Sequence, residues 1–344
     1  MDAMFRTLGK IPGALLIVPL FLAAIINTLV PEVLDLGSFT TALFRDGALP
    51  LIAMFFFVMG SQIRIKSVAS SLEKGIVMLL GKYVAALLIG FSVAWFTPNG
   101  TLFGLVPLAI IAAMGNSNGA MYIALTGQFG NKSDKGAVAP LSLNDGPLLT
   151  LIALGAAGLA DFSAKALLAV FLPIVLGFIV GNTSTIAREF LAPGEKIILP
   201  FALFAIGAGI DLGVLVSAGS VGILLGVMTV VISGGMAMGA LQLWHVVRRH
   251  PKPTRNLIGG ACEATTAGNA IATPAAVALA DPSYADVQAV ATSQVAAAVV
   301  VTSVLIPFVV VAVDRWQRKR GVTPEAEEAL YEPDAAREAD PQPA

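Results

Sequence analysis

Long apolar stretches, separated by short polar segments, fill almost the whole chain. Each stretch is about 20 residues long, which is the length that a helix needs to cross the ~30 Å hydrocarbon core of a bilayer. We therefore predict an all-α polytopic membrane protein with ten transmembrane helices. Their approximate bounds are 11–30, 40–62, 75–96, 102–128, 139–160, 164–182, 196–216, 218–243, 256–280 and 287–313.

The composition agrees with this prediction. The 344 residues are 56% hydrophobic and 12% charged, whereas soluble domains are roughly 45–50% apolar and ~25% charged. A formal net charge of −1 provides no basic field for nucleic acid, so we expect no such partner. The single Cys262 and two histidines exclude an intrachain disulfide and leave little for a zinc or iron–sulfur site. We expect no cofactor other than a coupling ion.

The distribution of basic residues predicts the orientation. With ten spans, 18 of the 21 Lys and Arg residues lie on the side that holds both termini. The opposite side has only Arg45 and Lys165, and Lys82 lies within a span. Because cytoplasmic loops carry the excess of Lys and Arg, we expect both termini in the cytoplasm.

Three pairs of short segments recur at a nearly constant offset. Residues 57–65 can be laid over 204–212 at an offset of 147, 117–120 over 266–269 at 149, and 142–144 over 292–294 at 150. A repeat of this length contains five spans, and an odd number of spans inverts the second copy. The alternative is coincidence in a sequence that uses few residue types.

The repeat divides the chain into a first five-helix unit over 1–160 and an inverted second unit over 161–316. The remaining residues, 317–344, are rich in Ala, Glu and Pro. Such a composition cannot bury a core, so we predict a disordered cytoplasmic tail.

The fourth and ninth spans carry polar interruptions. The fourth has residues 115–119, Gly-Asn-Ser-Asn-Gly, and the ninth has residues 263–269 followed by Thr273-Pro274. Glycine and proline favour a break, and backbone groups freed in a membrane need new partners. We predict two broken helices; where such breaks face each other, half-helix ends can attract an anion and unwound carbonyls can hold a cation. The alternative is an ordinary glycine kink.

Three ionisable residues are assigned to the interior of the predicted spans rather than to their ends: Lys82, Asp145 and Glu263. Each costs ~2.5–3.5 kcal/mol on insertion scales, so each requires a partner. A buried carboxylate is either protonated or placed beside a cation, and both states serve ion coupling. We assign coupling to Glu263 and Asp145, helped by Asn144 and Ser117. The alternative is a structural ion pair of Lys82 with Asp145 or Glu263.

A set of short motifs extends in order from about residue 8 to 316. It comprises residues 10–13 (Lys-Ile-Pro-Gly), 18–22, 59–63, Asn118-Gly119 with Tyr122, Ser142-Leu143 with 146–148, 209–212, 272–274 and 291–293. This set resembles the 2-keto-3-deoxygluconate permease family. The resemblance implies an inner-membrane symporter that imports this sugar acid with protons. It also implies the ten-helix fold of the superfamily that contains the bile acid/sodium symporters, with helices 3–5 and 8–10 as a core and helices 1, 2, 6 and 7 as a panel. In that fold the broken helices four and nine cross where they unwind.

One departure from the family bears on the coupling ion. Gly115 stands where family members carry an acidic residue, and Glu263 stands where they lack one. Ser117, Asn118 and Glu263, with Asn269, look more like the sodium-binding pattern of the bile acid symporters. A sodium ion at Ser117, Asn118 and Glu263 is therefore the alternative to a proton.

The sequence thus predicts cation-coupled transport by alternating access. The partners are a small organic anion and the lipid bilayer, and the protein is a monomer or a homodimer. A sugar-acid carboxylate is attracted by the half-helix ends and by Lys82. Its hydroxyls meet polar side chains of the interrupted spans, namely Asn118, Tyr122, Thr266, Asn269 and Thr273.

Other functions compete with this prediction. The same fold can transport a different organic anion with sodium. An intramembrane enzyme needs two facing aspartates or an acid-rich metal motif, and only Asp145 lies deep in a span. A passive channel would never accumulate its substrate above electrochemical equilibrium.

Overall fold

The computed structural model describes residues 14–62, 69–97, 99–144, 146–160 and 164–339. Over these ranges the chain is helical, and an isolated bridge between Leu102 and Leu105 is the only β pairing. The first half contains α2 (Ala14–Leu29), η1 (Pro31–Asp35), α3 (Ser38–Phe44), α4 (Ala48–Gln62), α5 (Ala69–Phe96), α6 (Pro107–Gly115), α7 (Gly119–Phe129), α8 (Lys132–Gly136), α9 (Val138–Leu141), η2 (Ser142–Asn144) and α10 (Leu148–Ala156). The second half contains α11 (Ala164–Thr183), α12 (Thr185–Leu191), α13 (Gly194–Gly207), α14 (Leu212–Met228), η3 (Thr229–Ser233), α15 (Gly234–Val247), η4 (Lys252–Thr254), α16 (Ile258–Cys262), η5 (Gly268–Ala272), α17 (Thr273–Ala280), η6 (Pro282–Tyr284), α18 (Ala285–Arg318) and α19 (Pro324–Ala339).

Several helices are long and apolar enough to cross a membrane. Three continuous helical stretches among the described residues meet this condition, 70–96, 212–247 and 282–318. The number is up to six if each of three bent helix pairs is one span. Shorter apolar helices cover Val18–Leu29, Phe171–Thr183 and Gly268–Ala280. The protein is therefore a multi-pass membrane protein, as predicted. Each of the ten predicted segments contains at least one helix, but the number of ten spans stays a prediction.

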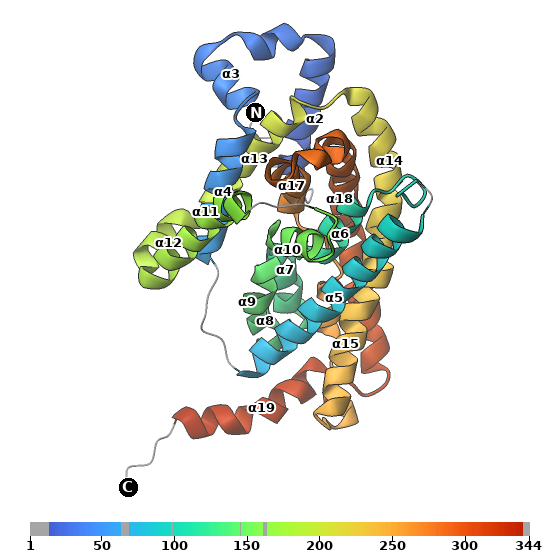
Figure 1. Ribbon diagram of the computed structural model, residues 1–344. Helices are drawn as coiled ribbons and strands as arrows, with labels where there is room; N and C mark the ends of the chain where they lie inside the picture. The colour runs from blue at the N-terminus through green and yellow to red at the C-terminus, as the bar shows by residue number, and fades with distance from the viewer. Residues whose placement is uncertain (1–13, 63–68, 98, 145, 161–163, 340–344) are drawn as a thin grey trace, which may run out of the picture.

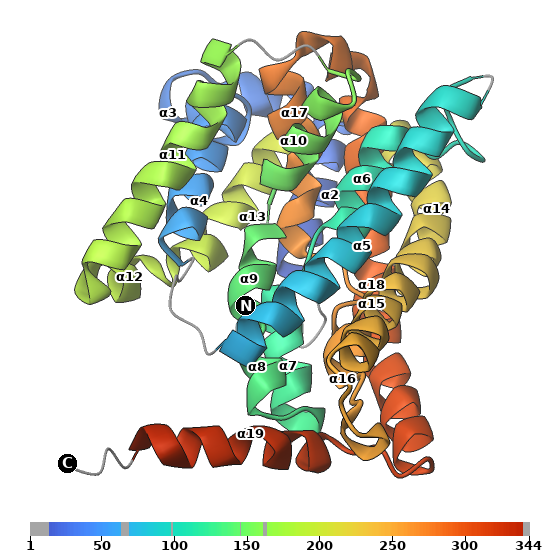
Figure 2. The same cartoon turned by 60° about the horizontal axis from the view of Figure 1, so that its bottom comes forward.

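The helices form two groups that are visible in both ribbon views. In the first group, α4 packs against α11 and α13, and α13 packs against α2. In the second group, α14 packs against α18, and α5 packs against α15 and α6. The first group lies on one side of the molecule, and α5, α14, α15 and α18 lie on the other (Figures 1 and 2).

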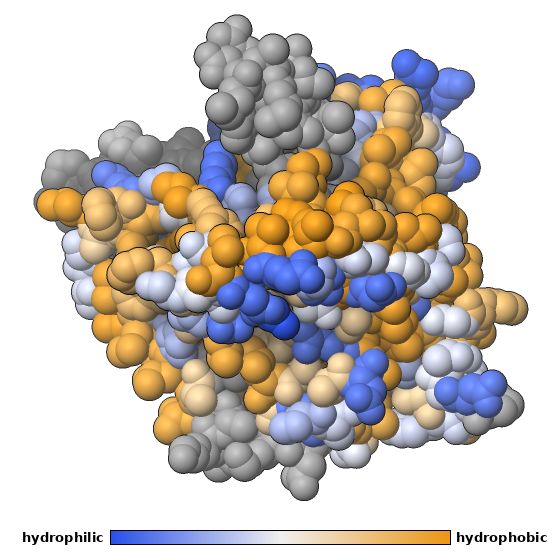
Figure 3. Space-filling view, turned by 90° about the horizontal axis from the view of Figure 1, so that it is seen from above, coloured by the Kyte–Doolittle hydropathy of each residue, from blue (hydrophilic) through white to orange (hydrophobic). Residues whose placement is uncertain are grey.

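The surface is largely apolar. Large hydrophobic side chains are exposed along the long helices, for example Leu88 at 58%, Leu176 at 46% and Val231 at 65%. Seen from above, hydrophilic residues gather across the middle of the face, and hydrophobic residues cover much of the rest (Figure 3). Exposed apolar surface of this extent fits lipid contact rather than contact with water.

The predicted disordered tail is wrong for the residues that the structure describes. Helix α18 continues to Arg318, and residues 324–339 form α19, which begins with Pro324. The Thr323 hydroxyl accepts a hydrogen bond from the amide of Ala326 in the first turn, and Glu327 is fully buried. Composition misled the prediction because this helix is held by buried polar contacts and not by an apolar core. Residues 340–344 lie outside the described ranges.

Two glycines allow very close helix contacts in the first group. A Cβ atom added at Gly60 in α4 would lie 2.2 Å from the carbonyl oxygen of Ile174 in α11. One added at Gly207 in α13 would lie 2.2 Å from the carbonyl oxygen of Leu20 in α2. Real Cβ atoms do not approach so closely, so any side chain would push the two backbones apart. Small residues at helix interfaces are the usual means of such packing in membranes.

We expect Gly60→Ala and Gly207→Ala each to destabilise the protein by ~1–3 kcal/mol, because overpacking forces the helices to shift. Thermal unfolding of the purified variants in detergent measures the effect. The control is Gly239→Ala in α15, where an added Cβ meets no atom within 4 Å. It should be neutral or stabilising by up to ~1 kcal/mol through helix propensity. Equal effects of all three changes would contradict the close-packing interpretation.

Candidate functional site

The two predicted interruptions are present in the structure. Helix α6 ends at Gly115 and α7 begins at Gly119, whereas α16 ends at Cys262 and η5 begins at Gly268. Asn118 caps α7, with its side-chain oxygen accepting a hydrogen bond from the Met121 amide at 3.0 Å. Gly115 ends α6, Asn118 caps α7 and Gly268 begins η5, so segments 102–128 and 256–280 are each interrupted.

The interruptions lie directly against each other. The amide of Asn118 donates to Thr265 Oγ1 at 3.2 Å, and the amide of Ala267 donates to Asn116 Oδ1 at 3.3 Å. Thr266 Oγ1 donates to the carbonyl of Ala113 at 2.9 Å. Each break thus supplies side chains that satisfy backbone groups of the other break, as buried backbone requires. We call the residues 113–118 and 263–267 the crossing.

Glu263 is the buried charge at the crossing, with 0% exposure. Its Oε1 lies 3.3 Å from Lys82 Nζ and accepts a short hydrogen bond from Ser117 Oγ. Lys82, also 0% exposed, donates to the carbonyls of Glu263 at 2.8 Å and Thr265 at 2.6 Å. The pair of Lys82 with Glu263, one of the two alternatives that the sequence left open, is present. The ammonium lies over carbonyls that the break has released from helix hydrogen bonding.

Two polar atoms beside the crossing lack partners. Among the described residues, Glu263 Oε2 and Asn144 Nδ2 are buried and make no hydrogen bond. Asn144 ends η2, and its carbonyl accepts from the amide of Ser117 at 3.3 Å. Unsatisfied buried groups are costly and call for a ligand, a water or a proton. Asp145, which the sequence also assigned to ion coupling, lies outside the described residues.

The other predicted substrate-binding residues are distributed around the crossing. Asn269 and Thr273 are buried at 3% and 1% in η5 and at the start of α17, and Thr273 Oγ1 has no hydrogen-bond partner within the described part of the chain. Tyr122 is fully buried, but its hydroxyl donates to the carbonyl of Asp134 in α8 at 2.9 Å. That contact already occupies the hydroxyl proton, so Tyr122 would need to change partner to bind a substrate.

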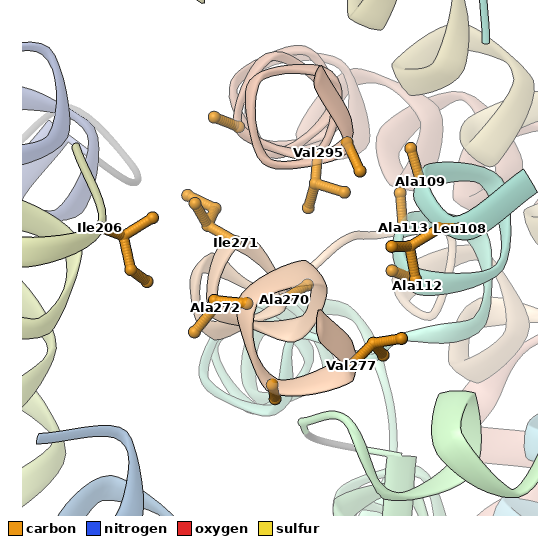
Figure 4. Close-up of a cluster of buried hydrophobic side chains, with 14 of the residues drawn as sticks. Leu108, Ala109, Ala112, Ala113, Ile206, Ala270, Ile271, Ala272, Val277 and Val295 are labelled. Atoms are coloured by element: carbon orange, nitrogen blue, oxygen red, sulfur yellow. The ribbon is translucent and has the colours of Figure 1, made fainter. Parts of the chain in front are cut away.

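Apolar side chains pack beside the polar crossing. In Figure 4, Ala109 and Ala113 of α6 lie near Val295 of α18, and Ile206 of α13 points toward Ile271 of η5. The broken segments are therefore in contact with both groups of helices.

Sequence reasoning missed two residues of the crossing, Asn116 and Thr265, and one that contacts it, Ser233. Asn116 also donates to the carbonyl of Gly146 at 3.3 Å, and Thr265 accepts from Asn118 as described. Ser233 in η3 donates to the carbonyl of Met114 at 2.7 Å. Asn116 and Thr265 lie within the predicted polar interruptions, which was a usable signal. No signal in the sequence indicated Ser233, since a serine in an apolar helix more often bonds to its own backbone.

The oxygen atoms at the crossing can hold a small hard cation or a proton. No group of three or more His, Cys, Asp or Glu residues that could hold a metal occurs among the residues described. The oxygen donors near Glu263 are a carboxylate, the Ser117 hydroxyl and carbonyls, which suit a hard cation such as sodium. The unsatisfied Oε2 of Glu263 equally suits a proton.

Comparison with known proteins adds the family. A family model described as 2-keto-3-deoxygluconate permease matches residues 5–319. The "2-keto-3-deoxygluconate permease 1" of Salmonella typhimurium is 44% identical over 315 residues, which cover 92% of this chain and 96% of that protein. The "2-keto-3-deoxygluconate permease" of Bacillus subtilis is 37% identical over 326 residues, again 92% and 96%. The protein of the same name from Xanthomonas axonopodis is 37% identical over 308 residues, 88% and 94%.

Proposed function

Because the chain belongs to the 2-keto-3-deoxygluconate permease family, and is thus a membrane transporter rather than an enzyme, we propose that it imports 2-keto-3-deoxygluconate or a related sugar acid by proton-coupled symport. The crossing is the proposed site, and alternating access is the proposed mechanism. The observation that carries this proposal is the buried Glu263, which is paired with Lys82 and has one oxygen unsatisfied.

An inverted five-plus-five repeat is supported by the hydrogen bonds of the crossing. Asn116 and Thr265 are 149 residues apart, and so are Asn118 and Ala267. The side chain of Asn116 accepts from the amide of Ala267, while the side chain of Thr265 accepts from the amide of Asn118. Exchanging the two copies therefore exchanges the two bonds, as a two-fold axis would.

Two further contacts follow the same rule. Lys82 of α5 donates to the carbonyl of Glu263, and Ser233 of η3 donates to the carbonyl of Met114. The two donors, Lys82 and Ser233, are 151 residues apart, and the two carbonyls that accept, those of Met114 and Glu263, are 149 residues apart. Gly60 and Gly207 are likewise 147 residues apart. The close contact of α4 with α11 at Gly60 therefore corresponds to that of α13 with α2 at Gly207.

These relations favour ten spans arranged as two repeats, 1–160 and 161–316. The first group of helices, α2, α4, α11 and α13, would be the panel formed by helices 1, 2, 6 and 7. The second group would be the core formed by helices 3–5 and 8–10. In this proposal the core carries the crossing past the panel.

Coupling would arise from competition for Lys82. Its ammonium pairs with Glu263, and the sugar acid brings a second carboxylate. A proton on Glu263 removes one counter-ion and leaves Lys82 to attract the substrate, so proton and anion favour each other's binding. Asp145, Asn144 and Ser117 would complete the coupling site, and Asn118, Thr266, Asn269, Thr273 and Tyr122 would meet the hydroxyls.

A sodium ion in place of the proton is the second candidate. It is favoured by the oxygen donors of Ser117 and Glu263, together with the side chain of Asn118 at the same break. Sodium would neutralise Glu263 as a proton does. The transported anion could then differ from 2-keto-3-deoxygluconate.

The proposed location is a bacterial-type inner membrane, with both termini in the cytoplasm. This orientation rests on the bias of Lys and Arg along the sequence. A monomer or a homodimer would serve the mechanism equally well.

Uptake into proteoliposomes tests the proposed function. We expect counterflow of labelled 2-keto-3-deoxygluconate, and accumulation when an inward proton gradient is imposed without sodium. Accumulation driven only by a sodium gradient would replace the proton with sodium. Counterflow that is absent for this sugar acid but present for another organic anion would overturn the substrate assignment, and transport that never exceeds equilibrium would indicate a channel.

A further inference from the structure

A buried polar cluster lies at the end of the molecule that α19 covers (Figure 2). The carboxylate of Glu327 accepts hydrogen bonds from Lys74 Nζ at 2.7 and 2.8 Å, Asn131 Nδ2 at 2.8 Å and Asn256 Nδ2 at 3.0 Å. All these side chains, and that of Asp134, are at most 3% exposed. We call Lys74, Asn131, Asp134 and Asn256 the tail socket.

The tail socket is suited to one carboxylate. Lys74 lies 2.5 Å from Asp134 Oδ1, and Asp134 Oδ2 accepts from the Asn256 side chain at 2.7 Å and the Asn131 amide at 3.0 Å. The ammonium and both amide groups then point their remaining protons at Glu327. An uncharged amide in that place would turn its own N–H groups toward donors, which a buried network does not tolerate.

The positive charge of the tail socket comes from Lys74, which also pairs with Asp134. Burial, followed by Arg248 and Lys74 itself, holds the pKa of the nearby His250 below its usual value, so that ring is neutral near pH 7. His245, whose Nδ1 lies 2.9 Å from His250 Nδ1, is fully buried and places Nε2 3.0 Å from the carbonyl of Asn256. Since a carbonyl only accepts, that Nε2 carries a proton and serves to hold Asn256.

The tail socket is connected to the crossing through two short elements. The Asn256 side chain accepts a hydrogen bond at 3.0 Å from the amide of Ile258, the first residue of α16. Glu263 follows α16 directly, ~10 Å from Asn256 along the helix. Tyr122 of α7 donates to the carbonyl of Asp134. The two halves of the broken segments that face α19 are thus both fixed by the cluster that Glu327 completes.

Helix α19 is not explained by family membership, because the family match ends at residue 319 and α19 begins at Pro324. We propose that Glu327 is a positioning residue for the crossing: α19 docks in the tail socket by this carboxylate, and the docked helix holds α16 and α7 so that Glu263 binds the coupling cation. The docking stands on its own geometry, whereas the effect on the cation rests on the proposed function.

Thiol labelling tests the docking. Ser133 is buried beside the tail socket and accepts from Lys74 at 3.2 Å, so Ser133→Cys in a Cys262→Ala background is a nearly isosteric reporter. In inside-out vesicles, we expect a membrane-impermeant maleimide to label it ~100-fold faster when Glu327→Gln is added, since losing one partner of a buried ion pair opens the docked helix.

The matched control is Glu328→Gln on the neighbouring position, whose carboxylate pairs with the 79% exposed side chain of Lys132. It should leave the labelling rate unchanged. Should Glu327→Gln fail to reach the membrane, Glu327→Asp keeps the charge with a shorter side chain and should give an intermediate rate. Labelling unchanged by either Glu327 variant would overturn the docking.

Transport measurements test the positioning. We expect Glu327→Gln to raise the cation concentration for half-maximal uptake ~10-fold, with a smaller change for Glu327→Asp and none for Glu328→Gln. Faster labelling with an unchanged cation dependence would make Glu327 purely structural and overturn the positioning role. If the unaltered protein transported no 2-keto-3-deoxygluconate, the proposed function would fail while the labelling result stayed valid.

Discussion

Proteoliposomes that contain the Glu263→Gln variant are expected to lose uphill accumulation of 2-keto-3-deoxygluconate. The initial rate of gradient-driven uptake should fall ~100-fold or more, because the removed charge is fully buried beside Lys82 and Ser117 and such pairs are worth several kcal/mol. Glutamine keeps the volume of the side chain but cannot take up or release a proton. Uptake under imposed proton and sodium gradients, measured beside equilibrium binding of labelled substrate, checks this.

Substrate binding should persist in Glu263→Gln, weakened by less than ~10-fold, since the coupling cation adds to affinity without being the sole source of it. The control is Glu328→Gln, which removes a carboxylate that pairs with Lys132 near the surface. This variant should transport normally. If the Glu263→Gln variant accumulated substrate as the unaltered protein does, the coupling site would have to lie elsewhere. Asp145 would then be the next residue to replace.

The broken segments were predictable because they conflict with their surroundings. Polar residues and glycine in the middle of an apolar stretch leave few structural options in a membrane. The contact between Lys82 and Glu263 could be anticipated as one of two pairs, since a buried charge needs an opposite charge. Establishing the contact with Glu263 required the fold, because Lys82 is 181 residues from Glu263 along the chain.

The tail socket was not predictable from composition. The sequence of residues 317–344 indicated a disordered tail because it is rich in Ala, Glu and Pro, yet the carboxylate of Glu327, the fourth residue of α19, is buried against Lys74. Lys74, Asp134 and Glu327 come from three distant parts of the chain, and no local pattern links them. The hydrogen bond from the Tyr122 hydroxyl to the carbonyl of Asp134 was not predictable either, because such polar contacts depend on the three-dimensional arrangement.

Replacing Lys82 by methionine should destabilise the protein by ~3–5 kcal/mol, because it leaves the fully buried Glu263 without its counter-ion and such a charge is strongly unfavourable. The carbonyls of Glu263 and Thr265 would lose a donor as well. In the double variant Lys82→Met/Glu263→Gln, both charges are gone, and most of that stability should return. Thermal unfolding in detergent of the two single variants and the double variant gives the coupling energy.

Transport separates structure from function in this cycle. The double variant should fold but accumulate no substrate, because neither a carboxylate for the cation nor an ammonium for the sugar acid remains at the crossing. Lys132→Met is the control, since its side chain is 79% exposed and surface pairs contribute ~1 kcal/mol or less. Additive losses in the double variant would show that Lys82 and Glu263 act independently. Restored accumulation in that variant would show that their pair only stabilises the fold, so the coupling charge would have to lie elsewhere.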